Sequence, residues 1–488
     1  MPGGWVKVRV KNLLIYRNYV VRFASLQMPS FRNPQVSTDM PFTVLPDARD
    51  PHMDSEAELQ RKLQLADRAF VAYRRTPLSD RARMLVCVAG ILEERAEDCA
   101  HLMTSEMGKT IVSARAEVLK CATVCRYYAE HGEAMLADEP SSSGYMRSFV
   151  RFQPLGTVLA IMPWNFPFWQ VFRFAAPALV AGNTILLKHA PNVSGCSLLI
   201  EDIFKMAGFA EGIFQSVFVE TSQIAALIAG PHIAAVTLTG SEAAGSSVAA
   251  AAGHAIKKVV LELGGSDPFI VLPSADMPAA LAAAVRSRML NNGQSCIAAK
   301  RILLHASIYD QALEQLATMV AGLRVGDPFD ELTEIGPLAS ERFVVHLQDQ
   351  VRRAIAAGAS VVIGGQDSAR GSNYFQPTIL TGLKQNVPVA REEFFGPVML
   401  VDRFATAEEA ISIANDTSFG LGASVWSTNE EEQRFFAEYL EVGQVFINAM
   451  TVSDPRIPFG GTKRSGLGRE LGIYGVREFT NVKSISFG

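Results

Sequence analysis

The sequence predicts an α/β fold made of two doubly wound units, each a mostly parallel sheet with helices on both faces. Apolar residues recur at helical spacing through residues 54–135, whereas short apolar strands alternate with helices after Pro154. A second alternating series follows Cys296. At 488 residues the chain is too long for one hydrophobic core, so we expect two or three domains. This pattern favours two α/β units that face each other across a cleft.

The individual elements follow in order along the chain. The helical region ends at Ser141–Gly144, and Tyr145–Arg151 then alternates like an exposed strand. Strands of the first series are expected at Thr157–Met162, Thr184–Lys188, Phe214–Val219, Ala234–Thr239, Val259–Leu263 and Phe269–Leu272. Strands of the second series are expected at Arg301–Leu304, Ser360–Ile363, Met399–Arg403, Ala423–Trp426 and Gln444–Asn448. The helical stretches between strands imply parallel pairing.

Composition excludes several classes of partner. Only 19% of residues are charged and the net charge is −4, which indicates neither a nucleic acid nor a membrane surface as partner. No apolar run reaches the length of a membrane span. Six cysteines without a disulfide framework favour a reducing, cytoplasmic setting. Cys121 and Cys125 have the spacing of a metal pair, but no histidine cluster completes a site, so we expect core packing and no metal.

The first 38 residues are basic and carry no acid before Asp39. Such a segment is either an organelle transit peptide or the result of a start codon assigned too far upstream. Met28 or Met40 would then be the true beginning, and the low serine content favours this second interpretation. Residues 1–40 are expected to form a poorly ordered extension.

One cysteine is set apart from the others by the segment Asn291–Cys296. A glycine turn and several amide side chains precede Cys296, and backbone N–H groups at such a turn favour the thiolate. Upstream, Glu262 lies between two leucines and before two glycines, a setting that raises a carboxyl pKa. A structural ion pair at a strand end is the alternative for this glutamate. Asn165, fixed between two prolines, supplies an amide that can stabilise an oxyanion.

A second group of residues is suited to a dinucleotide. The strand Ala234–Thr239 runs into Gly240 and Ser241, and Gly245 follows in the next helix, whose N-terminal amides could bind a pyrophosphate. Lys188 ends another strand at the same sheet edge, where ligands bind in open α/β folds. A tightly packed turn and a solvated lysine are the alternatives.

The three catalytic segments together resemble the aldehyde dehydrogenase superfamily, which the pattern Gly-Gln-x-Cys at Gly293–Cys296 marks most specifically. Its succinate-semialdehyde dehydrogenase branch is the most similar, through Tyr127–Gly132, Leu187–Val193 and Gly264–Phe269. The resemblance implies a dinucleotide-binding domain at residues 41–133 and 153–263, and a catalytic domain at 264–463. Residues 134–152 and 464–488 would form a β flap that lies across a neighbouring subunit in a homodimer or homotetramer.

The resemblance also implies roles for individual residues. Cys296 would attack the aldehyde, Asn165 would hold the oxyanion, and Glu262 would activate the water that hydrolyses the thioester. Contacts to an NAD or NADP cofactor would come from Trp164, Lys188, Gly240, Ser241, Gly245, Leu263, Glu393 and Phe395. Pro191 stands where NAD-specific members often carry a glutamate, so a 2′-phosphate would meet no repulsion there.

The expected substrate is succinate semialdehyde, whose carboxylate needs a cation and hydroxyl donors. Arg173 and Ser453 match substrate-binding positions of semialdehyde enzymes, and Arg456 is an added candidate. Leu290 replaces a further arginine of some members, and either arginine could instead form a structural ion pair. A broad enzyme for neutral or aromatic aldehydes is the rival, with Trp169, Phe168 and Phe172 at the entrance. A catalytically silent member of the fold is the rival from another class.

Overall fold

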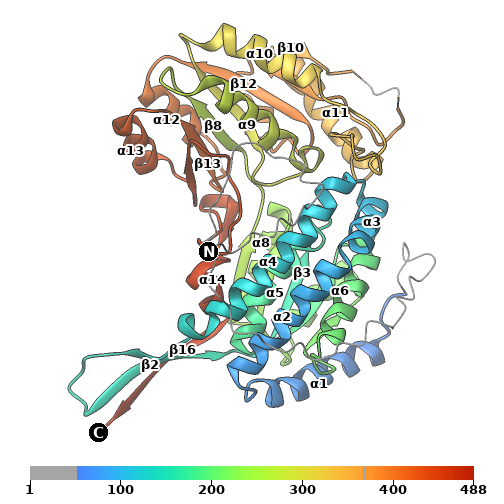
Figure 1. The fold of residues 1–488 in the computed structure, drawn as a ribbon, viewed down its shortest axis with the longest axis vertical. Helices are drawn as coiled ribbons and strands as arrows, with labels where there is room; N and C mark the ends of the chain where they lie inside the picture. Colours follow the sequence, from blue (N-terminus) through green and yellow to red (C-terminus); the bar gives the residue numbers. More distant parts are fainter. Residues whose placement is uncertain (1–51, 367–369) are drawn as a thin grey trace, which may run out of the picture. The chain divides into compact units, whose positions relative to one another are not determined.

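The computed structural model of the protein describes residues 52–366 and 370–488, so the expectations for residues 1–40 lie outside the described residues. Its strands form three sheets (Figure 1). The six-stranded sheet has the order β15-β7-β6-β3-β4-β5, and all neighbours are parallel except β15 and β7. Its strands are β3 (Thr157–Met162), β4 (Thr184–His189), β5 (Phe214–Ser216), β6 (Ile233–Thr239), β7 (Lys258–Glu262) and β15 (Gly466–Leu467).

The seven-stranded sheet has the order β10-β11-β12-β9-β8-β13-β14, with only the β10–β11 pair antiparallel. Its strands are β8 (Asp267–Val271), β9 (Ala299–His305), β10 (Ser360–Ile363), β11 (Thr378–Thr381), β12 (Val398–Phe404), β13 (Ala423–Trp426) and β14 (Val445–Ile447). In the third sheet, β2 (Arg147–Pro154) pairs with both β1 (Glu139–Pro140) and β16 (Thr480–Phe487). These sheets confirm the prediction of two doubly wound α/β units and a small β element.

Helices accompany both large sheets. Those before β9 are α1 (Glu56–Tyr73), α2 (Leu78–Glu94), α3 (Ala96–Met107), α4 (Ile111–Met135), α5 (Trp169–Ala181), α6 (Ser194–Met206), α7 (Ile224–Ala229), α8 (Glu242–His254) and α9 (Met277–Met289). Those after it are α10 (Tyr309–Ala321), α11 (Glu341–Ala356), α12 (Ala407–Asn415), α13 (Glu430–Tyr439) and α14 (Gly472–Glu478). No helix in the described part of the chain is long and apolar enough to cross a membrane.

The helix α5 anchors the site to the core. Every residue from Trp169 to Ala181 is buried, because α4 and α2 pack against α5 (Figure 1). The helix ends at Gly182, which adopts the left-handed conformation with φ 100°. A Cβ at that position would collide with the Arg81 guanidinium, so glycine is needed there for both backbone and space. The first turn of α5 is therefore held rigidly.

Three details differ from the sequence expectations. The strand predicted at Phe269–Leu272 is β8, and it belongs to the second sheet, because the chain crosses between sheets at residues 263–266. The strand β11 was not predicted. Residues 464–488 were assigned to the flap, yet β15 pairs with β7 in the six-stranded sheet. Only β16 joins the third sheet, where Thr480 faces Pro154 and Phe487 faces Arg147.

Candidate active site

The turn before Cys296 is held in an unusual backbone conformation. Asn291, Asn292 and Gly293 are consecutive left-handed residues, with φ of 55°, 58° and 77°. Asparagine and glycine tolerate this region best, which explains the residue types at this turn. The Nδ2 atom of Asn291 donates to the carbonyl of Asn165 at 2.6 Å. The cysteine turn is thereby fixed against the loop that carries the predicted oxyanion donor.

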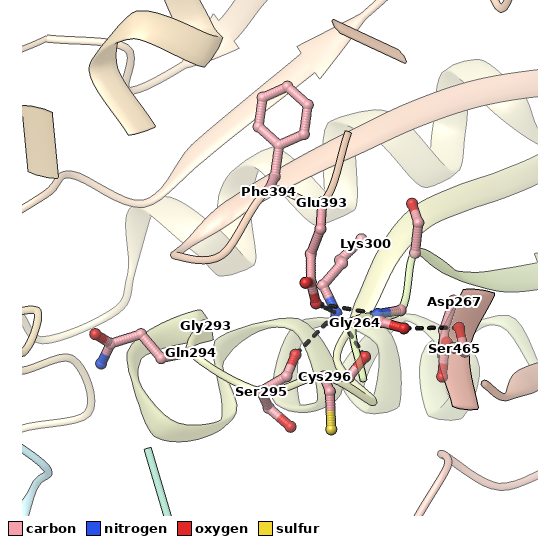
Figure 2. Close-up of polar contacts among 12 residues, drawn as sticks. Gly264, Asp267, Gly293, Gln294, Ser295, Cys296, Lys300, Glu393, Phe394 and Ser465 are labelled. Carbon is pink, nitrogen blue, oxygen red and sulfur yellow. Dashed lines mark hydrogen bonds and ion pairs between the residues drawn. The ribbon is translucent and has the colours of Figure 1, made fainter. Parts of the chain in front are cut away.

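A buried lysine links the cysteine to the segment that carries Glu393. The Nζ atom of Lys300 donates to the carbonyl oxygens of Ser295 at 2.8 Å and Cys296 at 2.7 Å, and lies 3.1 Å from Oε1 of Glu393 (Figure 2). Glu393 also accepts from the Gly265 backbone N–H at 3.2 Å. Sequence reasoning missed Lys300, although a lysine inside an apolar strand four residues after the cysteine is a usable signal.

The protonation of Cys296 depends on its burial. Burial raises the pKa of its thiol to about 12, while Lys300 and Arg173 act in the opposite direction. The expectation that backbone N–H groups favour the thiolate stays a prediction, which the burial of Cys296 opposes. The thiol is protonated at neutral pH, because the cost of burying a charge exceeds the attraction of the two cations.

Glu262 ends β7 and points into protein. Only 2% of this residue is exposed, and neither carboxylate oxygen has a hydrogen-bond partner among the described residues. Burial raises the pKa of Glu262 well above its usual value, Arg173 lowers it and Glu470 raises it further. The carboxyl thus has the raised pKa expected from its apolar setting, and it forms none of the described ion pairs.

The Asn165 side chain is oriented from both ends. Its Nδ2 atom donates to the Gln294 carbonyl at 3.0 Å, and its Oδ1 atom accepts from Gln170 Nε2 at 3.1 Å. Both Asn165 and Gln170 are buried. The amide nitrogen therefore points toward the cysteine turn, and its second N–H is free to meet a developing negative charge.

Arg173 has a protein partner. Its guanidinium forms an ion pair with Glu470, and both side chains are almost fully buried. The guanidinium also lies 4.5 Å from the ring centroid of Phe459. The structure therefore supplies the ion pair that the sequence left as the alternative for Arg173. Glu470, whose pKa burial raises against the pull of Arg173, carried no signal in the sequence.

The two other substrate candidates differ from each other. Ser453 is buried, and its Oγ atom accepts a hydrogen bond from Lys120 Nζ at 2.7 Å. Arg456 is 71% exposed and donates from Nε to Asp454 Oδ1 at 2.8 Å. This arginine thus forms the surface ion pair that was its alternative. Phe168 and Phe172, expected at the entrance, are instead fully buried and stacked in the core.

The predicted phosphate turn is compact. Gly240 donates to the Glu262 carbonyl at 3.0 Å, and Ser241 caps α8 by accepting from Ala244 N–H at 3.3 Å. A Cβ at Gly245 would lie 2.5 Å from Cδ2 of Leu263, so only glycine allows this approach. The N-terminus of α8 therefore lies directly beside the end of β7, the strand that carries Glu262, the carboxylate predicted to be catalytic.

Lys188 and two aromatic rings complete the cofactor candidates. Lys188 is the penultimate residue of β4, and burial lowers its pKa, while Glu220 opposes that shift. It forms no ion pair with a described residue, so its ammonium remains available to ribose oxygens or a phosphate. The Trp164 ring lies 5.9 Å from the Phe395 ring, edge to face. An available cation, a helix N-terminus and an aromatic pair fit a dinucleotide.

Comparison with known proteins gives the same assignment. The sequence profile of the aldehyde dehydrogenase family matches residues 41–485. A probable succinate-semialdehyde dehydrogenase [NADP(+)] of Synechocystis sp. is 53% identical over 88% of this chain and 95% of its own. Succinate-semialdehyde dehydrogenase [NADP(+)] 1 of Mycobacterium tuberculosis is 51% identical over 88% of this chain and 95% of its own length. The structure of succinic semialdehyde dehydrogenase from Streptococcus pyogenes, in complex with NADP+, is similar, with a TM-score of 0.88 and 35% identity. The match covers 90% of this chain and 96% of that one. The resemblance is thereby confirmed, and this chain belongs to the aldehyde dehydrogenase family.

Proposed function

We propose that this protein oxidises succinate semialdehyde to succinate, with a nicotinamide dinucleotide as the hydride acceptor. The observation that carries the proposal is the buried Glu262 carboxyl, which has no hydrogen-bond partner among the described residues and acts electrostatically on Cys296. A carboxyl with a raised pKa beside a nucleophilic thiol is the pair that thioester hydrolysis requires. The names of relatives about half identical to this chain support the choice of substrate.

The first covalent step takes place at Cys296. The Cys296 thiol releases its proton to solvent and its sulfur adds to the aldehyde carbon, and Lys300 and Arg173 favour the anionic form of the sulfur. The carbonyl oxygen becomes an oxyanion, which the free N–H of Asn165 and the Cys296 backbone N–H stabilise. A nicotinamide held by Glu393 and Phe395 would supply the hydride acceptor, and loss of hydride from the former aldehyde carbon would leave a thioester on Cys296.

The second step is hydrolysis. Glu262 takes a proton from water, and the resulting hydroxide attacks the thioester carbon while the cysteine sulfur leaves. The products are a carboxylic acid and the Cys296 thiolate, which becomes a thiol again by recovering the proton that Glu262 took from water. Because Glu262 is desolvated, its raised pKa makes it an effective base near neutral pH. Lys300 keeps the Cys296 carbonyl fixed throughout.

For the cofactor we propose NADP before NAD. Lys188 would contact the adenosine ribose, Ser241 and the N-terminus of α8 a phosphate, and Glu393 with Phe395 the nicotinamide end. Pro191 at the start of the segment after β4 supplies no carboxylate that would repel a 2′-phosphate. Relatives whose names specify NADP(+) support this preference.

We also propose a homodimer or homotetramer that acts in the cytoplasm. The strand β16 is an edge of its sheet and exposes Val482 and Phe487, as an edge that meets a second copy would. All six cysteines are free, which supports a reducing compartment. Co-fractionation with a cytosolic marker is the expected result, and recovery with an organelle would overturn the cytoplasmic assignment.

The catalytic proposal is tested by steady-state kinetics on succinate semialdehyde, butanal and benzaldehyde, each with NAD and with NADP. We expect the highest kcat/KM for succinate semialdehyde with NADP. Cys296→Ala is the matched control, since it should bind the cofactor but form no product. Equal or higher kcat/KM for the neutral aldehydes would overturn the substrate assignment. Cofactor reduction by Cys296→Ala near the wild-type rate would overturn the mechanism.

A further inference from the structure

Lys120 joins three separate segments near the active site. It lies on α4, and its ammonium donates to Ser453 Oγ at 2.7 Å. The same ammonium lies 4.0 Å from the ring centroid of Trp169, the first residue of α5. Ser453 and Trp169 are both buried, at 6% and 4% exposure, and Lys120 itself is partly buried. A lysine is seldom held in such a place without a charge to meet.

This ammonium has no carboxylate partner among the described residues. Asp454, which follows Ser453 in the chain, is instead engaged by Arg456 through two atoms. The contacts to Lys120 are a hydroxyl and an aromatic face, which stabilise a cation without neutralising it. Arg173, in contrast, is already neutralised by Glu470. Lys120 is therefore the cation here that remains ready to bind an anion.

The position of Lys120 relative to the reacting groups follows from α5. Gln170, in the first turn of this helix, holds the Asn165 amide at 3.1 Å. Its neighbour Trp169 lies under the Lys120 ammonium. The same turn therefore contacts both the predicted oxyanion donor Asn165 and the Lys120 ammonium, which links the cation to the site. The indole N–H of Trp169 is buried and has no partner in the described residues, so it remains a donor for a ligand.

We propose that Lys120 binds the distal carboxylate of the substrate, with Ser453 as a hydrogen-bond donor and Trp169 as the wall of the subsite. This inference rests on the proposed function, because it requires an aldehyde that carries a carboxylate. In the structure the Ser453 hydroxyl accepts a hydrogen bond from Lys120. When the carboxylate binds, this hydroxyl rotates and donates a hydrogen bond to it. Lys120 thereby selects semialdehydes over neutral aldehydes of equal length.

The charge on Lys120 depends on pH within the working range. Burial and then Arg173 lower its pKa to about 8, whereas Cys121, Glu117 and Asp454 act in the opposite direction. The ammonium is charged at pH 7 and largely neutral above pH 9. The KM for succinate semialdehyde should therefore rise with pH above 8, while the KM for butanal should not follow that rise.

Lys120→Met tests the proposal, since methionine keeps the length and apolar stem but removes the charge. For succinate semialdehyde we expect KM to rise at least about tenfold and kcat to stay within about twofold. For butanal both constants should stay within about twofold. Arg126→Met, which removes an exposed charge from the same helix, is the matched control and should leave kcat and KM unchanged for both substrates.

Lys120→Arg is the second variant, and it should keep the preference for succinate semialdehyde while abolishing the rise of KM above pH 8. If wild type shows no preference for succinate semialdehyde over butanal, the proposed function fails. If wild type shows the preference and Lys120→Met keeps it, the role of Lys120 fails and the function stands. An equal loss of kcat/KM for both aldehydes in Lys120→Met would assign Lys120 a structural role and overturn the proposal. If Lys120→Met does not fold, an unchanged pH rise in Lys120→Arg overturns the proposal.

Discussion

Gly293 lies against the backbone of Gly396, so closely that a Cβ atom at position 293 would collide with it. This approach joins the cysteine turn to the segment that carries Glu393 and Phe395. Arg288 reinforces the junction, since its Nη2 atom donates to the carbonyl oxygens of both glycines. The nucleophile and the proposed nicotinamide contacts are therefore held as one unit.

Gly293→Ala should break this junction. The φ of 77° and the collision both oppose a side chain, so the cysteine turn must shift. A displacement of about 1 Å can lower kcat by about a hundredfold, and steady-state kinetics measures that loss. Gly253→Ala, a glycine with open space in α8, is the control and should behave like wild type. Wild-type kcat in Gly293→Ala would show that the contact is dispensable.

Glu262→Gln should separate the two chemical steps. Hydride transfer precedes hydrolysis, so a burst of reduced cofactor is expected, followed by a steady state slowed by at least about a hundredfold. Stopped-flow absorbance resolves the two phases, and mass spectrometry should detect the acyl group on Cys296. Cys296→Ala, as control, should give no burst. Loss of the burst in Glu262→Gln would place this residue before hydride transfer.

The raised pKa of Cys296 can be tested by alkylation. Because the thiol pKa is about 12, the thiolate fraction is small at neutral pH. The rate of iodoacetamide labelling at Cys296 should therefore increase about tenfold per pH unit between pH 6 and 9. Cys296→Ser corrects for labelling of Cys87, the other partly exposed cysteine. A rate that levels off below pH 8 would show that the thiolate is favoured in the cofactor-free protein.

Arg173→Leu should lower the kcat/KM for succinate semialdehyde and for butanal alike, because the partner of Arg173 is Glu470. Removing the cation leaves a buried carboxylate uncompensated, which costs on the order of 3–5 kcal/mol of unfolding free energy. It also removes a charge that lowers the pKa of Glu262, so the hydrolysis rate should require higher pH. Thermal unfolding and pH–rate profiles measure both effects.

Arg456→Leu is the control for this experiment, because that exposed ion pair contributes little. It should leave stability and both substrates nearly unchanged. If Arg173→Leu lowers kcat/KM only for succinate semialdehyde, Arg173 binds the substrate carboxylate, as the sequence suggested.

The three proposed catalytic residues could be singled out from the sequence because each stands in a local pattern. Cys296 follows a glycine turn, Glu262 lies between leucines, and Asn165 lies between prolines. Lys300 was missed, because its partners are backbone carbonyls and a glutamate 93 residues away, as their numbers show. The sequence left an ion pair open for Arg173 but could not identify Glu470 as its partner, for the same reason. Side chains that act through long-range pairing leave no periodic or local signal.

Strand prediction had a similar limit. The short apolar runs between helical stretches located β3, β4 and β6 closely, because buried parallel strands consist of continuous apolar residues. It could not assign β8 to its sheet, since neighbouring strands along the chain can belong to different sheets. The short β15 has no apolar run of its own and exists only through pairing with β7.

The assembly prediction concerns the edge strand β16. Light scattering at micromolar concentration should report a dimer or tetramer. Val482→Lys, which places a charge on the exposed edge, should shift the protein toward monomer. Val361→Lys, at an exposed valine of β10, is the control and should keep the wild-type mass. A wild-type monomer would overturn the assembly, and an unchanged mass in Val482→Lys would exclude this edge from the interface.

The pairing of β15 with β7 has a consequence for synthesis of the chain. Gly466 faces Glu262 in the register, so one edge of the strand that carries the proposed base stays open until Gly466 has left the ribosome. Contacts between residues so distant in sequence form late and slow folding. The nascent chain must therefore carry a β7 that pairs with β6 on one side and has an open edge on the other. Premature termination before Gly466 would yield a fragment with an exposed strand, prone to aggregate rather than to act.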